Sequence, residues 1–411
     1  MALHLSTYFS RSPIRLLSRI NTLAKQYAGH DLTLLFALSS NIPDPEHLGK
    51  AVNELTRFDR TRTVGCLSGR LGGTTISEVK MDQDVVSLAV AFMDSGMVRP
   101  FRSTIPGRDE AQVGRWHAFR KKDEPEPVEV PLDDDTLVWG DERAVPLPED
   151  LRTIDPSHIQ GVLYFSDLKP EGLLSSFTHL PNVNKLGLIA SSTPFVTGRP
   201  VTLFQNHEIF SSGAVGLVFE RKTCLAVDFL DVTKISPVMT VTKSEGNMVN
   251  SLDNKNPTQL LLSAIKQSGL KAHASDWLKE EEQFSLAALS SSGKVDRVYK
   301  ITAGDPSRGS ISLDSPYAPT LGTQVQFLHR PSSSLPNLAL SQLHRSAFNF
   351  LTVSEEVYAS SRPNSQEDFE LVLENTFLAS SENGFVLGRD EGEKNGGNVK
   401  CSLAGSLGSF L

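Results

Sequence analysis

The chain has 411 residues, of which 39% are hydrophobic and 21% are charged. This composition excludes general disorder and leaves room for two or three domains. The net charge of -8 offers no basic surface for phosphates, so nucleic acid is excluded as an expected partner. Cys66, Cys224 and Cys401 lie too far apart for a disulfide framework or a zinc site. No run approaches the ~18 apolar residues of a membrane-spanning helix, so we expect a soluble protein in a reducing compartment.

The first 30 residues allow two interpretations. Four lysine or arginine residues and no acid precede Asp31, as in a mitochondrial presequence. Ser12 and Pro13 are instead typical of a helix start, and apolar residues then recur at helical spacing. We expect an N-terminal helix within 1–30 of a cytoplasmic or nuclear protein, and cleavage of this segment would place the protein in the mitochondrial matrix.

Strand-like and helix-like segments alternate through the first half of the chain. The expected strands are 32–38, 63–66, 85–93 and 97–102, and the expected helix is 45–58. The strands at 85–93 and 97–102 are expected to pair across the turn-forming residues 94–96. Residues 105–135 are rich in proline and charge, which predicts a long solvated loop.

A strand, a helix and a strand at 159–165, 170–178 and 185–190 predict a βαβ unit. Short strands are expected later in the chain, at 201–204, 213–220, 223–229, 238–243, 284–289, 295–301, 310–313, 324–328 and 369–379. Pro257 begins an expected helix that Gly269 ends. The pattern predicts an α+β fold of mixed β-sheets covered by helices, with one domain at 31–253 and another at 257–411.

Motifs for common chemistry are missing from the sequence. The glycines in Gly69-Arg70-Leu71-Gly72-Gly73 fit neither a Walker loop nor a dinucleotide fingerprint, and there is no zinc motif, so no cofactor and no metal are expected. There is also no G-x-S-x-G nucleophile, which favours a non-enzymatic protein. Cys66 follows an apolar strand and is interpreted as a small buried residue, a pocket wall or the reactive thiolate of a hydrolase.

Separate stretches of the chain resemble one family. They are TVGCLSG at 63–69, LFQN at 203–206, SGAVGLV at 212–218, SPVMTVTKSEGN at 236–247, YKI at 299–301 and GDP at 304–306. Their order resembles the FIST proteins, which combine a FIST N domain and a FIST C domain. The resemblance extends from about Asp31 to the C-terminus and implies two FIST-type domains.

The resemblance implies a sensory protein that binds a small, amino-acid-like ligand and is linked to signalling or to ubiquitin-dependent protein turnover. In animals, FIST regions follow an F-box. The segment 147–151 resembles the start of an F-box, but the βαβ unit that follows does not continue it. Residues 231–236 also differ from the Gly-Cys-Arg-Pro-like stretch of bacterial members, which leaves the ligand open. The alternative is an adaptor that selects substrates for a ubiquitin ligase through protein surfaces only, with ligase components as partners.

The ligand site is expected where backbone and polar side chains from distant segments meet. The expected ligand-binding residues are Gly65, Cys66, Ser68, Gly69, Gly213, Thr242, Lys243 and Asn247. Lys243 would supply a positive charge, and N–H groups in the glycine turns would bind a carboxylate. This hypothesis requires that 65–69 and 242–247 lie together. Its alternative is that the glycines only bend and pack the strands.

Overall fold

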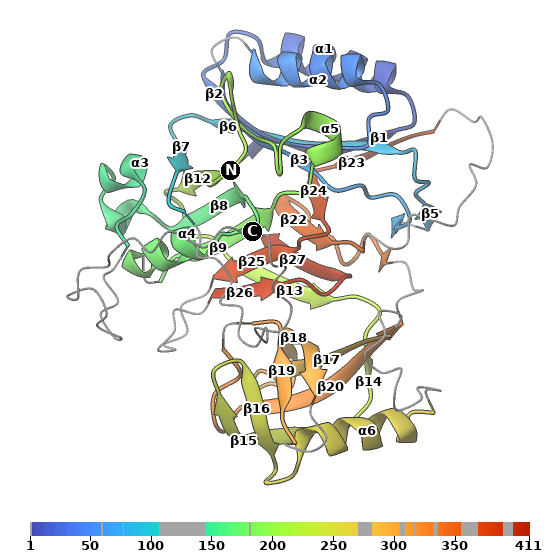
Figure 1. Ribbon diagram of the computed structural model, residues 1–411. Coiled ribbons are helices and arrows are strands. Elements are labelled where there is room, and N and C mark those ends of the chain that lie inside the picture. Colours follow the sequence, from blue (N-terminus) through green and yellow to red (C-terminus); the bar gives the residue numbers. More distant parts are fainter. Residues whose placement is uncertain are drawn as a thin grey trace, which may run out of the picture.

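The computed structural model describes residues 2–58, 61–76, 78–106, 145–180, 182–269, 282–304, 309–315, 317–331, 336–354, 369–388 and 398–411. Most of the expected charged loop at 105–135 lies outside these residues. The described chain folds into mixed sheets with helices on their outer faces, so the predicted α+β class is confirmed. Figure 1 shows a layered body, which contains both chain ends, and a barrel below it.

The first sheet of the body runs in the order β11-β10-β3-β2-β6-β1-β23. Its strands are β11 (Glu208–Phe210), β10 (Leu203–Gln205), β3 (Thr61–Ser68), β2 (Leu32–Ser39), β6 (Val86–Asp94), β1 (Ala2–Ser10) and β23 (Glu370–Glu374). Helices α1 (Pro13–Tyr27) and α2 (Pro45–Thr56) cover its outer face (Figure 1). The Ser12 hydroxyl caps α1, and its buried Leu16, Ile20 and Leu23 pack on the sheet, as helical periodicity predicts.

The second sheet runs in the order β26-β25-β9-β8-β12-β7. Its strands are β26 (Asn398–Cys401), β25 (Phe385–Gly388), β9 (Asn184–Ile189), β8 (Gly161–Ser166), β12 (Ala214–Phe219) and β7 (Val98–Ser103). The short helices α3 (Glu149–Arg152) and α4 (Glu171–Ser176) cover its outer side, with 3-10 turns at Pro156–His158 and Phe177–His179. β8 and β9 are parallel and joined through α4, which confirms the predicted βαβ unit.

The two sheets enclose one apolar core. Leu35 of β2, Phe165 of β8 and Phe350 belong to the same buried cluster, which also contains Cys66. A third sheet closes the body, in the order β13-β27-β22-β24. Its strands are β13 (Leu225–Phe229), β27 (Ser406–Phe410), β22 (Ala347–Thr352) and β24 (Thr376–Ser381), and a small sheet beside it contains β21 (Asn337–Leu338), β4 (Thr75–Ile76) and β5 (Val79–Lys80).

The lower part of the chain is a closed barrel. Its strands follow the order β20-β15-β16-β19-β18-β17, and β17 pairs back with β20, while β14 (Thr233–Lys234) adds to β20. They are β20 (Gln324–Pro331), β15 (Met239–Glu245), β16 (Met248–Leu252), β19 (Ile311–Leu313), β18 (Val295–Gly304) and β17 (Glu282–Leu289). Asn256 caps α6 (Pro257–Gln267), which buries Leu261 and Ile265 against the barrel core.

One predicted pairing is wrong. The strand expected at 97–102 does not pair with the strand before it, because β6 already has β1 on one side and β2 on the other. The turn at Asp94 carries the chain into the second sheet instead, where β7 pairs with β12. This crossing connects the two sheets and places the start of β7 near the edge of the first sheet.

Several long-range strand pairings were not predicted from the sequence. β1 precedes the expected N-terminal helix and is an interior strand, between β6 and β23. The strand expected at 369–379 is divided at Asn375, which has a φ of 55°, into β23 and β24 of different sheets. The boundary expected at 253–257 falls inside the barrel, between β16 and α6. The division of the chain into domains stays a prediction.

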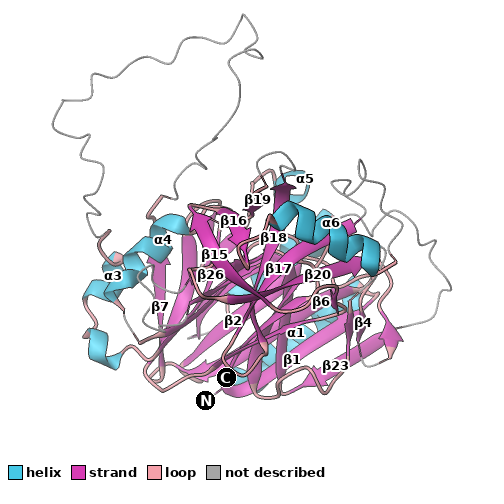
Figure 2. Cartoon of the chain, turned by 90° about the horizontal axis from the view of Figure 1, so that it is seen from below, coloured by secondary structure: helices cyan, strands magenta, loops and turns pink. Residues whose placement is uncertain are grey.

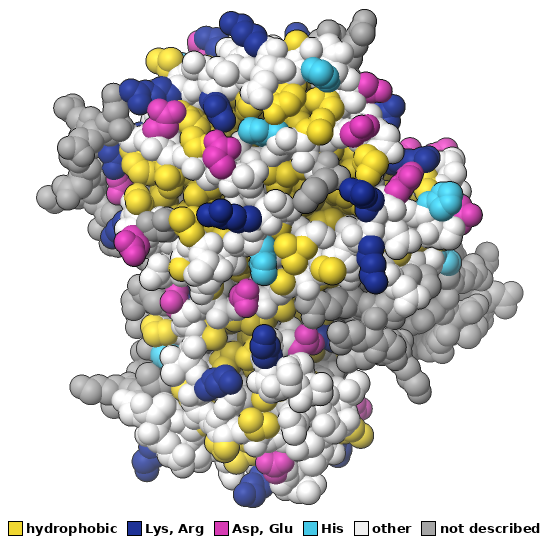
Figure 3. Space-filling model, turned by 180° about the vertical axis from the view of Figure 1, so that it is seen from behind, with side chains coloured by type: hydrophobic (Ala, Val, Ile, Leu, Met, Phe, Trp, Pro, Cys, Tyr) yellow, Lys and Arg dark blue, Asp and Glu magenta, His cyan; other side chains and the backbone are white. Residues whose placement is uncertain are grey.

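The outside of the molecule combines helices, the two chain ends and charges of both signs. Figure 2 shows α3, α4 and α6 on the outside of a strand-rich interior, and in both ribbon views the two chain ends lie close together. On the rear face, acidic and basic side chains are interspersed rather than gathered by sign (Figure 3). None of the helices in the described ranges is long and apolar enough to cross a membrane.

Candidate functional site

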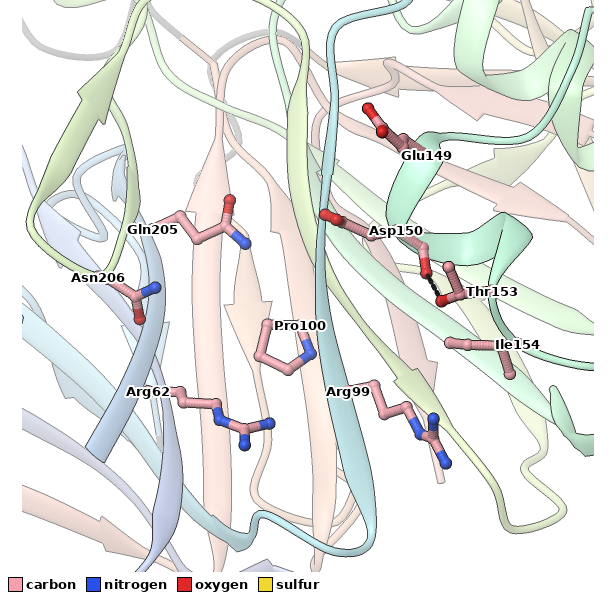
Figure 4. A pocket seen from close by; sticks show the side chains of 9 residues that line it. All are labelled: Arg62, Arg99, Pro100, Glu149, Asp150, Thr153, Ile154, Gln205 and Asn206. Carbon is pink, nitrogen blue, oxygen red and sulfur yellow. Dashed lines mark hydrogen bonds between the residues drawn. The ribbon is translucent and has the colours of Figure 1, made fainter. Parts of the chain in front are cut away.

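A cleft of about 520 Å³ opens where the edges of the two body sheets meet α3. Its walls come from β3, β7, the β10–β11 turn and α3 (Figure 4). The lining residues are Arg62, Arg99, Pro100, Glu149, Asp150, Thr153, Ile154, Gln205 and Asn206. Most of these side chains are charged or polar, and the volume is in the range of small-molecule sites, ~300–1,000 Å³.

Two arginines near the N-terminal ends of strands line the cleft. Arg62 is the second residue of β3 and points outward between Thr61 and the buried Thr63. Arg99 is the second residue of β7, and Glu220 holds its guanidinium group at 2.9 Å. The guanidinium group of Arg62, in contrast, makes no hydrogen bond or ion pair with any described residue. Its planar fork of donors is therefore available to an anionic group.

Two carboxylates lie on the α3 side of the cleft. One oxygen of Asp150 accepts a hydrogen bond of 2.8 Å from the backbone N–H of Arg102 on β7, which ties α3 to the second sheet. The Thr153 hydroxyl donates to the Asp150 carbonyl at 3.0 Å and fixes the same turn (Figure 4). Glu149 begins α3 and is exposed, without an ion pair to the described part of the chain.

The third wall is the turn between β10 and β11. Asn206 has a φ of 53°, a left-handed conformation that asparagine tolerates better than most residues. Its Oδ1 atom accepts a hydrogen bond of 3.1 Å from the N–H of Thr63. The oxygen is thereby occupied, and the amide Nδ2 group stays available as a donor beside Arg62 (Figure 4).

The predicted site residues on β3 serve packing. An added Cβ at Gly65 would lie 2.5 Å from the ring of Phe36, so glycine there admits the aromatic ring. The Gly69 N–H donates to the Ser380 carbonyl at 2.7 Å, which ties β3 to β24. Ser68 is buried in the same strand. Burial also raises the pKa of the Cys66 thiol well above its usual range, so this residue is a neutral core side chain rather than a thiolate.

Gly213 is likewise structural. Its φ of 76° favours glycine, and its N–H donates to Asp167 at 2.5 Å. An added Cβ would lie 2.2 Å from the Ser103 carbonyl, so no side chain fits. The glycines of the predicted site therefore turn and pack the chain.

The other predicted site residues lie in the barrel. Thr242 donates to Ser251 at 2.8 Å and Asn247 donates to the Leu313 carbonyl at 3.3 Å, so both side chains stabilise the barrel. Lys243 is exposed on β15. Figure 1 shows β15 and β3 in different parts of the molecule. The convergence of 65–69 with 242–247 does not occur, because these segments belong to separate sheets with separate cores.

Sequence reasoning missed the residues that do converge. Arg62 and Glu149 lie far apart in the sequence, and only strand pairing and the short α3 bring them to one cleft. The available signal was weak: polar residues interrupt the buried pattern at the start of β3 and β7. A metal-binding group of histidine, cysteine, aspartate or glutamate is absent from the described residues.

The fold is of the α+β class, and the cleft is a candidate binding site. The chain belongs to the FIST N domain family, which matches residues 31–255, more than half of its length. FIST domains are sensory domains of signal transduction rather than a catalytic family. Every residue that lines the cleft lies within the matched range. Among curated proteins, none matches this sequence. The FIST C assignment of the second half stays a prediction.

Proposed function

We propose that this chain is a non-enzymatic sensor of a small zwitterion of the amino-acid type, which binds in the cleft of Figure 4. One observation carries the proposal: the cleft combines a guanidinium pair, from Arg62 and Arg99, with a carboxylate pair, from Glu149 and Asp150. A zwitterion presents the complementary pair of charges at a short separation. Complementary charge of this kind favours such a ligand over a purely anionic or purely apolar one.

The carboxylate of the ligand would bind at Arg62. This guanidinium group has no partner among the described residues, whereas Arg99 is held by Glu220. A carboxylate and a guanidinium group form two parallel, charge-assisted hydrogen bonds, which are stronger than bonds between neutral groups. The Nδ2 group of Asn206 adds a neutral donor on the same side. Arg99 contributes charge without changing its own ion pair.

The ammonium group of the ligand would bind at the α3 side. Glu149 is unpaired among the described residues, and Asp150 is oriented by the N–H of Arg102 at 2.8 Å. Because Asp150 accepts this bond through one oxygen, its other oxygen remains available. The cleft is open to water, so each ionic contact contributes modestly and we expect a dissociation constant in the micromolar to millimolar range.

The test is calorimetric titration of the full chain with the twenty common amino acids. We expect one or a few of them to bind and Arg62→Met to weaken binding at least about tenfold, because one bidentate pairing is lost. Arg345→Met is the matched control, since Arg345 is exposed outside the cleft and its loss should leave affinity unchanged. Binding that survives in Arg62→Met, or no binding by any amino acid, would refute the proposal.

The link from ligand to response would be a protein partner in signalling or ubiquitin-dependent turnover. Phe195 on α5 (Pro194–Thr197) is fully exposed and Val196 beside it is 40% exposed, which supports a protein contact at this helix. The rival function, a substrate-selecting adaptor of a ubiquitin ligase, would use such surfaces without a ligand. Recovery of ligase subunits with the ligand-free Arg62→Met variant, at the level of the unmodified chain, would favour the adaptor.

A further inference from the structure

A second cleft, of about 660 Å³, lies between the barrel and the body. One wall is the end of the β17–β18 hairpin, a second is formed by Ser315, residues 317–323 and the start of β20, and the third is β26 of the second body sheet. Figure 1 places β26 directly above the barrel strands β18 and β19. The cleft lies outside the range matched by the FIST N domain family, so the family assignment says nothing about it.

The charges of this cleft are balanced within it. Its one cationic lining residue among those described is Arg297, and the one acidic residue is Asp296, whose Oδ2 lies 3.4 Å from the guanidinium Nε. Both side chains are largely buried, at 14% and 23% exposed. The pair leaves no surplus positive charge for a phosphate or carboxylate. An anionic ligand is therefore disfavoured here, in contrast to the first cleft.

The rest of the lining is neutral and rich in hydroxyl and amide groups. The residues that carry them are Ser290, Ser291, Tyr299, Ser315, Tyr317, Thr320, Thr323, Gln324 and Asn398. The hydroxyl oxygens of Thr320 and Thr323 lie 3.1 Å apart, which pre-positions two donor–acceptor groups on one wall. Tyr317, which lines the same cleft, is 54% exposed and adds an accessible aromatic side chain.

We propose that this cleft binds a neutral polyhydroxy compound of the sugar class. Each sugar hydroxyl both donates and accepts hydrogen bonds, as do the threonine hydroxyls and the Gln324 and Asn398 amides. The C–H face of a sugar ring would pack on Tyr317, because aromatic rings combine a large apolar area with a polar edge. The inference is independent of the amino-acid site, since the two clefts share no lining residue.

A bound sugar would contact both the barrel and the body. Thr320, Thr323 and Tyr317 belong to the barrel part, whereas Asn398 belongs to β26 of the body. A ligand that contacts both parts favours the arrangement in which they are closest. Occupancy of this site would therefore fix the barrel relative to the body.

The experiment is saturation-transfer NMR on the full chain with D-glucose, D-galactose, trehalose and myo-inositol at millimolar concentration. We expect saturation transfer to at least one of them, and a loss of affinity of about tenfold or more in Tyr317→Ala and in Thr323→Val. Thr302→Val is the matched control, because Thr302 lies on β18 outside the cleft and its loss should leave the signal unchanged. Unchanged circular dichroism would show that the variants fold.

Two results would overturn the proposal. One is the absence of saturation transfer to any of the four compounds from the folded chain. The other is a signal that persists in both Tyr317→Ala and Thr323→Val, which would assign binding to another surface. Because Arg62→Met leaves this cleft intact, a sugar signal that persists in that variant supports two separate sites.

Discussion

Thr63 and Asn206 exchange three hydrogen bonds at the edge of the first sheet. The Asn206 N–H donates to the Thr63 carbonyl at 2.8 Å, the Thr63 N–H donates to Asn206 Oδ1 at 3.1 Å, and the Thr63 hydroxyl donates to the Asn206 carbonyl at 3.2 Å. The exchange holds a residue in the left-handed conformation next to Arg62. It makes one wall of the first cleft rigid before any ligand arrives.

Asn206→Ala should lower the free energy of unfolding by about 1–3 kcal/mol, because it removes the Oδ1 acceptor and places an L-alanine at a φ of 53°. Urea denaturation measures the change. Asn206→Asp is the matched control, because it keeps the acceptor and tolerates the same backbone, so stability should change little. This variant should still weaken binding of the amino acid, since it replaces the Nδ2 donor with a negative charge. Equal stability loss in both variants would contradict this account.

Replacing glycine with alanine should have opposite effects on stability at Gly65 and at Gly49. Gly65→Ala should destabilise by about 1–3 kcal/mol, because the new methyl group would lie 2.5 Å from the Phe36 ring in a closed core. Gly49→Ala, on the exposed side of α2 with no atom within 4 Å, should stabilise by about 0.5–1 kcal/mol. Urea midpoints compare the two directly. A tolerated Gly65→Ala would mean that the glycine is not required by packing.

Local features of the fold were predictable from the sequence, whereas its long-range pairing was not. The apolar run at 32–38 and the Pro257 helix start were correctly assigned, because hydrophobic periodicity and caps act within a few residues. The pairing of Thr7 with Leu373 depends on residues far apart in the chain. No local pattern encodes such a contact, so the closed barrel and the interior position of β1 were missed.

The residues that the sequence predicted to form one ligand site do not lie together, for a related reason. Lys243 and Gly65 were chosen because they stand in conspicuous motifs, but one is an exposed barrel residue and the other packs on a phenylalanine. Arg62 is one of several arginines at 57–62, and Glu149 stands in the segment 147–151, which was interpreted only as an F-box-like start. An arginine at a strand start cannot be told from any other solvated charge until the pairing of the strands is known.

Tyr8 predicts a loss of stability at alkaline pH. Its hydroxyl donates to Glu370 at 2.6 Å, and burial together with this bond raises the pKa of Tyr8 from 10.0 to about 12. Because the folded state holds the proton more tightly than the unfolded state, the stabilisation is complete below pH 10 and is lost as the pH rises towards 12. Urea midpoints between these values should fall more steeply for the unmodified chain than for Tyr8→Phe. Parallel curves would contradict the assignment.

The N-terminal strand predicts that residues 1–30 stay in the mature protein. β1 pairs with β6 and β23, and Tyr8 and Phe9 on it are buried. Deletion of residues 2–10 should therefore abolish cooperative unfolding, because it removes an interior strand of the first sheet. Leu3→Ser, at a side chain that is 64% exposed, is the control and should fold normally. Mass spectrometry of the native protein would contradict the prediction if the folded chain begins after residue 30.

The closed barrel predicts where the chain divides into folding units. In chain order its strands begin with β14 at Thr233 and end with β20 at Pro331, and the chain on either side belongs to the body. The strands β23 and β25, later in the chain, complete sheets that begin in the first half, and β27 pairs with β13, which precedes the barrel. A division at 253–257 would leave β15 and β16 on one side and their partners β20 and β19 on the other.

A fragment covering 231–336 should therefore fold alone, whereas a fragment covering 257–411 should not. The first contains every pairing of the barrel and the α6 face that covers it, so its apolar core is complete. The second exposes the edges of β19 and β20 and separates β25 from β9. Circular dichroism with urea denaturation of both fragments decides between them. Cooperative unfolding of 257–411 without cooperative unfolding of 231–336 would contradict this prediction. It would place the domain boundary at 253–257 and show that the barrel depends on the body for its stability.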